Sequence, residues 1–268
     1  MDRGILEKYK KQEDRLLLSK IIDKITFCKE KNKTQNTSFL DLTQRKLVDS
    51  FLLMQKEKNY IFYGGIDNAE RVIAFIYPEK LDDLVKTNKF DFNVIFSCIR
   101  ITLPNELKGT FEHRRYLGAL MKLGVNRQKI GDIIVYDEGA DIIVLSDIEK
   151  FLLNSLSELT RFKKAKIEKI KLENIKKIEI IKQEEKIIVS SMRLDNIVSE
   201  LYKCSRNKAI EVIDSERVFV NFELNIKSSK EIKQGDVITI RGKGRFEIDE
   251  ILGNSKKGKI IVKIAKYM

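Results

Sequence analysis

The residues best suited to chemistry form the run Ser205 to Ala209, with the sequence SRNKA, directly before the apolar residues of a short helix. Serine is a good N-cap at such a point because its oxygen accepts a hydrogen bond from a free backbone N–H of the first turn. That turn carries a partial positive charge and favours acidic side chains, yet here it holds Arg206 and Lys208. A phosphate group would resolve this conflict. The run therefore predicts a phosphate-binding site.

Further basic residues flank this run in the C-terminal part of the chain. Arg193 precedes another expected helix and lies beside Asp195, which we expect either to cap that helix or to hold the arginine in place. A basic segment that alternates with Gly242 and Gly244 ends an expected strand, where glycines let a ligand approach the backbone, although a plain strand exit explains them as well. The candidate nucleic-acid contacts are Arg193, Ser205, Arg206, Asn207, Lys208, Arg241, Lys243 and Arg245.

A second basic patch is a candidate in the middle of the chain. Its members are Arg114, Arg115, Arg127 and Lys129. A solvated helix face explains these residues equally well. Tyr60, Phe62 and Tyr63 are candidates for stacking on bases, but aromatic residues in strands more often belong to a core.

The sequence offers little for catalysis. His113 is the only histidine, so a multi-histidine metal site is excluded, and between charged neighbours it is typical of a cap or a surface residue. Residues 242–247 lack the third glycine of a dinucleotide-binding loop and follow no βα unit. A carboxylate-dependent RNA enzyme stays an alternative, with Asp67 or Asp132 as its candidate residue. We expect no catalytic residue, no metal and no cofactor.

The charge of the chain is strongly positive and unevenly distributed. Lys and Arg number 52 against 40 Asp and Glu, a net charge of +12. The excess lies in residues 1–50 (12 against 8), 161–185 (9 against 5) and 186–268 (17 against 11), whereas residues 51–160 carry 14 against 16. Such asymmetry favours a polyanion-binding surface on particular units, although a genome rich in lysine codons produces the same total.

Composition places the chain among globular proteins. Apolar residues make up 43% and charged residues 34%, which excludes a disordered chain. No apolar run approaches the roughly 20 residues that span a bilayer, and the N-terminus lacks the apolar segment of a signal peptide, so we expect a cytoplasmic protein without membrane contacts. Cys28, Cys98 and Cys204 are odd in number and far apart, which favours reduced thiols over a disulfide framework.

Several elements must position these residues. Apolar residues recur at helical spacing in residues 5–55, with Asp41 or Thr43 as a cap for the second helix. From residue 60 the pattern mixes strands and helices, and Ser146 and Glu149 have the spacing of a capping box. In this middle part we expect strands at 60–63, 71–77 and 92–103, helices at 112–123 and 147–159, and a hairpin of 132–135 with 141–145.

The C-terminal part follows a basic connector. Residues 161–185 fit neither the helical nor the strand period, and we expect them to be a connector that is part strand. After it come two helices and two strands, at 194–201, 209–213, 218–222 and 237–241. The expected fold class is α/β (α+β). The expected domains are an N-terminal helical segment (1–55), an α/β domain with the connector (56–185) and a C-terminal domain (186–268).

The C-terminal motifs resemble those of the S4 RNA-binding domain. They are Arg193-Leu194-Asp195, the SRNKA run, Val218-Phe219-Val220-Asn221 and Gly235-Asp236-Val237-Ile238. In that family two helices and a β-ribbon present a basic face to structured RNA. The resemblance implies RNA contacts at Arg193, Ser205, Arg206 and Lys208.

Upstream motifs resemble the YlmH family. They are Tyr63-Gly64-Gly65 before Ala69-Glu70-Arg71, the run from His113 to Leu120 (HRRYLGAL), and Lys129-Ile130-Gly131-Asp132-Ile133. The resemblance extends from about Phe39 to the end and implies an RRM-like α/β domain before the S4 domain. It also implies a ribosome-associated RNA-binding factor of Gram-positive-type bacteria, acting on large subunits that carry peptidyl-tRNA and supporting alanine tailing of the stalled chain.

The sequence thus predicts a non-enzymatic RNA-binding protein in ribosome-associated quality control. Its expected partners are the large ribosomal subunit, its 23S-type rRNA and tRNA, and we expect a monomer when it is free. Two alternatives stay open. One is an S4-domain RNA-modifying enzyme, such as a pseudouridine synthase or a methyltransferase, and the other is an interaction protein linked to cell division.

Overall fold

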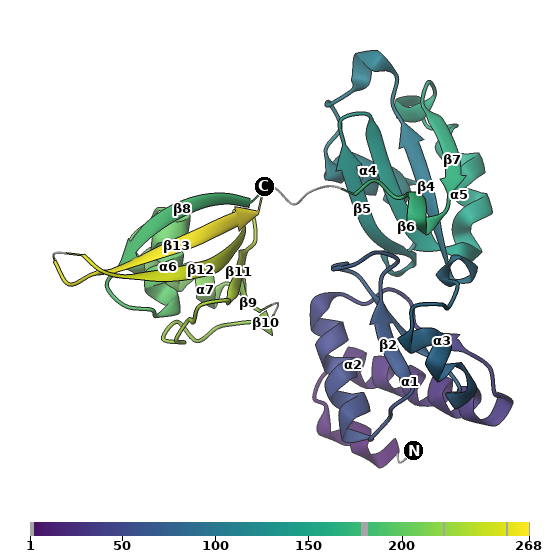
Figure 1. Ribbon diagram of the computed structural model, residues 1–268, viewed down its shortest axis with the longest axis horizontal. Coiled ribbons are helices and arrows are strands. Elements are labelled where there is room, and N and C mark those ends of the chain that lie inside the picture. Colours follow the sequence, from purple (N-terminus) through teal and green to yellow (C-terminus); the bar gives the residue numbers. More distant parts are fainter. Residues whose placement is uncertain (1–2, 178–181, 222, 256, 268) are drawn as a thin grey trace. The chain divides into compact units, whose positions relative to one another are not determined.

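The computed structural model describes residues 3–177, 182–221, 223–255 and 257–267 (Figure 1). The chain divides into two compact units, Met1–Ile178 and Glu179–Met268, and each is described by itself. No helix in the described ranges is long and apolar enough to cross a membrane. The three-part domain division stays a prediction: in the structure the N-terminal helices belong to the first compact unit, and the second unit begins before residue 186.

The first unit begins with helices that pack on a small sheet. A 3-10 turn (Arg3–Lys8) leads into α1 (Gln12–Lys31), and α2 (Leu42–Met54) follows. Asp41 caps α2 as expected: it accepts a hydrogen bond from the Gln44 backbone N–H while the Gln44 side chain accepts from Asp41 N, which completes a capping box. The sheet has the order β1-β3-β2, with β1 at Gln35–Asn36, β2 at Tyr60–Tyr63 and β3 at Ile73–Ile76.

The second part of this unit is a four-stranded antiparallel sheet of order β5-β6-β4-β7. Its elements are β4 (Phe96–Thr102), α4 (His113–Lys122), β5 (Ile130–Tyr136), β6 (Gly139–Leu145), α5 (Glu149–Leu156) and β7 (Lys166–Ile170). This βαββαβ order is that of the RRM-like folds, so the expected fold is confirmed. Apolar residues of α4 and α5, such as Tyr116, Leu120 and Leu152, pack with Ile99 and Ile142 on one face of the sheet.

The other face of the four-stranded sheet is also covered. Phe96 and Ile143 lie there in one core with Phe75 of β3 and with Ile175, which follows β7. The carboxylate of Asp141 is buried on this face and accepts two hydrogen bonds from Arg100, both at 2.7 Å, as well as the backbone N–H of residue 176 at 2.8 Å. The sheet surface on which RRM domains stack bases is therefore occupied by the chain itself.

The aromatic residues of β2 belong to these cores. The ring of Tyr63 lies 4.5 Å from that of Phe92, and the Tyr60 hydroxyl donates to Asp49 at 2.9 Å. Phe62 packs against the core beneath α1 and α2. The structure therefore favours a core role for Tyr60, Phe62 and Tyr63 over base stacking.

Two local expectations in this unit were wrong. Ser146 and Glu149 form no capping box, because a 3-10 turn (Ser146–Ile148) precedes α5; the Ser146 hydroxyl donates to Val94 O, and the Glu149 carboxylate binds Ser97 and Lys169 instead. Residues 92–94 form a 3-10 turn rather than the start of a strand. Residue 41 and the hairpin of β5 with β6 agree with expectation. A short helix, α3 (Asp82–Lys86), was not expected.

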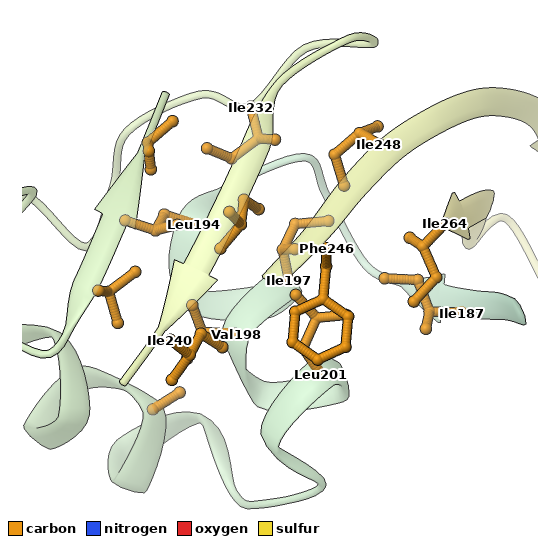
Figure 2. Close-up of a cluster of buried hydrophobic side chains, with 14 of the residues drawn as sticks. Ile187, Leu194, Ile197, Val198, Leu201, Ile232, Ile240, Phe246, Ile248 and Ile264 are labelled. Carbon is orange, nitrogen blue, oxygen red and sulfur yellow. The ribbon is translucent and has the colours of Figure 1, made fainter. Parts of the chain in front are cut away.

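The second unit is a six-stranded antiparallel sheet covered by two helices on one face. The strand order is β10-β9-β11-β12-β13-β8. Its elements are β8 (Lys182–Val189), α6 (Leu194–Tyr202), α7 (Arg206–Asp214), β9 (Val218–Val220), β10 (Glu223–Leu224), β11 (Val237–Ile240), β12 (Gly244–Asn254) and β13 (Ile260–Tyr267). Figure 2 shows Ile197, Val198 and Leu201 of α6 packed with Ile240 and Phe246 of the sheet. The expected helix, helix, strand, strand order is present, with β8, β10, β12 and β13 in addition.

Candidate nucleic-acid interface

The corner between α6 and α7 is rigidly built. Lys203 ends α6 in the left-handed conformation, at a φ of 55°. The backbone N–H of Cys204 donates to Ser199 O at 3.0 Å, and the Ser199 hydroxyl returns a bond to Cys204 O at 2.8 Å. Both bonds satisfy groups that a helix end leaves free. The start of α7 is therefore held in a fixed position relative to α6.

Ser205 caps α7, as the sequence predicts. Its hydroxyl oxygen accepts a hydrogen bond from the Lys208 backbone N–H at 3.3 Å. The first turn holds no acidic residue, and Arg206, Asn207 and Lys208 are all exposed. This helix end thus displays basic side chains and free N–H groups to solvent.

A buried carboxylate links two of the arginines. Asp195 is 0% exposed, and its Oδ2 accepts from Arg193 Nη2 at 2.8 Å and from Arg206 Nη2 at 2.9 Å. Burial raises the pKa of Asp195, but the bonds from Arg193 and Arg206 outweigh it and hold the pKa below its ordinary value. We expected Asp195 either to cap α6 or to hold Arg193. The structure shows that it holds Arg193. Arg206, which lies 11 residues further along the chain, binds the same carboxylate.

Lys208 also has a partner within the chain. Its Nζ lies 2.6 Å from the Glu211 carboxylate, and both side chains are more than half exposed. Exposed pairs of this kind contribute little to stability, so the ammonium exchanges readily to another anion. The sequence argument needs a corresponding revision: carboxylates of the protein offset part of the conflict at the start of α7. Two guanidinium groups still share one carboxylate, which leaves the cluster of Arg193, Asp195 and Arg206 with a net charge of +1.

Lys243 extends this basic surface from the sheet side. It lies in the turn between β11 and β12, and its Nζ is 5.1 Å from the centre of the Tyr202 ring at the end of α6. Burial raises the pKa of the Cys204 thiol, and the charges of Lys208 and Lys243 oppose that shift, so both ammonium groups lie near this thiol. We call the resulting surface the helix-end patch, made of Arg193, Ser205, Arg206, Lys208 and Lys243.

A groove of about 770 Å³ lies next to this corner. One wall is Lys203, Cys204 and Ser205, and β8 supplies the opposite wall. Glu185 and Glu200 line it together with basic residues, so the groove adds no positive field to the helix-end patch.

Arg241 and Arg245 do not belong to the helix-end patch. Ile240 and Phe246, their neighbours in sequence, point toward α6 (Figure 2). Because side chains alternate along a strand, Arg245 of β12 points to the opposite face of the sheet. Arg241 lies in the turn after β11, and its guanidinium group lies over the ring of Phe219 rather than near α6. The turn between these strands uses Gly242 at a φ of 82°, a conformation that favours glycine.

The candidate second patch is largely engaged within the first unit. Arg127 is half-buried and donates to Ile130 O at 2.7 Å, Lys129 pairs with Asp147, and Arg114 lies 3.0 Å from the Glu112 carboxylate. The remaining member, Arg115, lies over the ring of Phe111. Burial and the charge of Arg71 lower the pKa of Arg127 to about 10. RNA binding by these four residues stays a prediction.

Asp132 and His113, which were weighed for catalysis, lie among groups of the protein itself. The carboxylate of Asp132 accepts the backbone N–H groups of Glu70 at 2.7 Å and Arg71 at 3.0 Å, and burial raises its pKa. Burial and the charge of Arg127 lower the pKa of His113. In the described ranges no three His, Cys, Asp or Glu residues come together as a metal site.

Comparisons with known proteins agree with this architecture. Residues 87–179 match the family model of the putative RNA-binding domain in YlmH, and residues 192–238 match that of the S4 domain. The S4 match contains the first turn of α7 and ends before Arg241.

The chain is also similar to named proteins. It is 30% identical over 253 residues to ribosome-associated protein quality control protein P2 of Bacillus subtilis strain 168, a match that covers 93% of each chain. The solved structure of cell division protein ylmH from Streptococcus pneumoniae aligns at 20% identity with a TM-score of 0.47, over 63% of this chain and 98% of that one. From the first of these matches and the two domains, the chain belongs to the YlmH family of RNA-binding proteins with a C-terminal S4 domain.

Proposed function

We propose that this protein binds large ribosomal subunits that carry peptidyl-tRNA and acts in the quality control of stalled nascent chains. The observation that carries the proposal is the helix-end patch, where an exposed, Ser205-capped helix end gathers four cations. Membership of the YlmH family supports the ribosomal role, since the Bacillus subtilis relative is named for ribosome-associated protein quality control. In this proposal the protein is a cytoplasmic monomer when it is free. Its binding partners are 23S-type rRNA and tRNA.

The patch suits the phosphate backbone of a structured RNA. Arg193 and Arg206 are held by Asp195 while about half of each side chain stays exposed, so their outward N–H groups are oriented before RNA arrives. Lys208 would exchange its exposed partner Glu211 for a phosphate at little cost. Phosphate contacts fix position and carry little sequence information, so we expect steep salt dependence and modest sequence preference.

Association with large subunits tests the proposal. Arg206→Ala with Lys208→Ala removes two phosphate contacts and is expected to weaken co-sedimentation with large subunits. It should also make the salt dependence shallower: the negative slope of log affinity against log salt should decrease in magnitude by about 1.4 to 1.8. The matched control is Lys257→Ala with Lys259→Ala, which removes two exposed charges of the same unit at the turn between β12 and β13 and is expected to bind as the wild type does. Equal binding by both variants would contradict the proposed site.

A further inference from the structure

The second unit has a sheet face that its helices leave open. Val218, Val220, Ile238 and Ile240 belong to the core beneath α6 and α7, so the residues between them point the other way. Phe219 and Thr239 are such residues, both partly exposed. This face therefore has a composition of its own, independent of the helix-end patch.

Strand pairing arranges this face as a continuous row. Thr239 of β11 pairs with Phe219 of β9 on one side and with Arg245 of β12 on the other. Phe219 in turn pairs with Leu224 of β10. Beyond Arg245 lies the ring of Tyr267 on β13, 5.6 Å from its guanidinium carbon. One row thus crosses the sheet with arginine between two aromatic rings.

The arginines of this face lie on the rings. The guanidinium carbon of Arg241 is 4.9 Å from the centre of the Phe219 ring, an arrangement stabilised by cation–π attraction. Arg217 lies beside it: its backbone oxygen accepts the Arg241 N–H at 2.9 Å, and its Nη2 donates to Arg241 O at 2.8 Å. We call this surface the sheet-face patch, made of Arg217, Phe219, Thr239, Arg241, Arg245 and Tyr267.

Two of the three arginines of the patch have no acidic partner in the part of the chain that the structure describes. In the described ranges neither Arg217 nor Arg241 forms an ion pair. The neighbouring carboxylate of Glu247 accepts from Lys182 and from the Tyr267 hydroxyl, both at 2.7 Å, so it is already engaged. Within the patch, the hydroxyl oxygen of Thr239 is covered and has no hydrogen-bond partner among the described residues, so it belongs to the packing beneath the row.

We propose that the sheet-face patch binds unpaired nucleotides of RNA, a second contact that rests on the proposed RNA-binding function. A guanidinium that already covers a ring on one side offers its outer plane to a base, and bases stack on such planes. Ribose-phosphate oxygens would meet Arg217 and Arg241. An apolar protein partner fits less well, because cations cover the rings, and an acidic protein segment would supply charge without planar groups to stack.

Binding of a short single strand to the full chain tests this proposal. The probe is a fluorescent oligouridylate of about ten nucleotides, followed by anisotropy, beside a hairpin RNA of duplex character. Arg241→Ala with Arg245→Ala is expected to weaken oligouridylate binding about tenfold and to leave hairpin binding unchanged. Arg206→Ala with Lys208→Ala is expected to weaken hairpin binding and to leave oligouridylate binding unchanged. If the second pair alone loses binding, for both RNAs, the sheet-face proposal fails while the proposed function stands.

A conservative variant separates stacking from charge. Arg241→Lys with Arg245→Lys keeps both charges but removes the planar groups, so we expect it to bind oligouridylate almost as weakly as the alanine variant. Wild-type affinity in the lysine variant would overturn the stacking contact. Equal loss of hairpin and oligouridylate binding in the alanine variant would also overturn it, because it would show a general charge effect.

Discussion

A single buried carboxylate, that of Asp195, holds two arginines of the helix-end patch in place. Both arginines reach it from helix starts, Arg193 as the N-cap of α6 and Arg206 in the first turn of α7. Removing one partner of such a group leaves the other charges without compensation, which costs more than the bonds contribute when intact. This residue therefore links the stability of the second unit to the orientation of its basic surface.

We expect Asp195→Asn to destabilise the second unit by about 1–3 kcal/mol at neutral pH, because the amide cannot balance two guanidinium groups. The pKa of Asp195 is lower in the folded state than in the unfolded one, where it is about 3.9. Its contribution is therefore present above that value and is lost as the pH falls through the folded-state pKa. Urea unfolding of both proteins as a function of pH checks this. We expect the wild-type protein to lose more unfolding free energy than Asp195→Asn as the pH falls. An equal loss in both proteins would contradict the role of the ionised Asp195 carboxylate.

Residue roles were predictable from the sequence where they depend on near neighbours. The Ser205 cap depends on a spacing of three residues and is confirmed. The pair of Lys208 with Glu211 has the same spacing and was readable but was missed. The bond from Arg206 to Asp195 joins two helices, and the contact of Arg241 with Phe219 joins two strands, so both depend on the tertiary fold. These contacts place the candidate residues on two faces of the second unit, the helix side and the open side of the sheet. The spacing of residues in the sequence does not reveal this division.

At the scale of elements, regular patterns were predictable and irregular strands were not. The helices α4, α6 and α7 and the hairpin of β5 with β6 follow the expected periods. The long strand β12 was missed because its register shifts between Ile248 and Glu250 and again between Ile251 and Gly253, which breaks the alternation of apolar and polar residues. The strand β8 lies partly within the basic connector, and the other part of that connector contributes β7 to the first unit.

The hairpin of β5 with β6 depends on Gly139. Its φ is 152°, and a Cβ atom there would lie 1.8 Å from Ile101 O of the neighbouring strand. Gly139→Ala is therefore expected to cost about 3 kcal/mol or more in the free energy of unfolding. Gly118, inside α4, has open space within 4 Å of the position that a Cβ atom would take, so Gly118→Ala is expected to stabilise by about 0.5–1 kcal/mol. Urea unfolding followed by circular dichroism measures both, and shifts in the same direction would contradict this account.

At the scale of the whole molecule, the two units have separate apolar cores. The cluster that contains Ile197 and Phe246 lies within residues 187–264, and the other three lie within residues 5–175. The second unit carries 18 basic against 14 acidic residues, a net charge of +4. Composition alone could not separate the units, since the chain between their cores follows neither the helical nor the strand period. A division by core predicts that each unit unfolds cooperatively on its own.

Calorimetry of the full chain with a short RNA tests this division together with the RNA contacts. We expect two unfolding transitions in the free protein. A hairpin RNA that binds the helix-end patch, at a free concentration of about 100 times its Kd, would stabilise the second unit by about 2.7 kcal/mol. For a unit of this size that corresponds to a rise in Tm of about 10 °C or more. The transition of the first unit should stay in place if the hairpin binds at the helix-end patch alone. A single transition in the free protein would contradict separate cores, and equal shifts of both transitions would assign RNA contacts to the first unit as well.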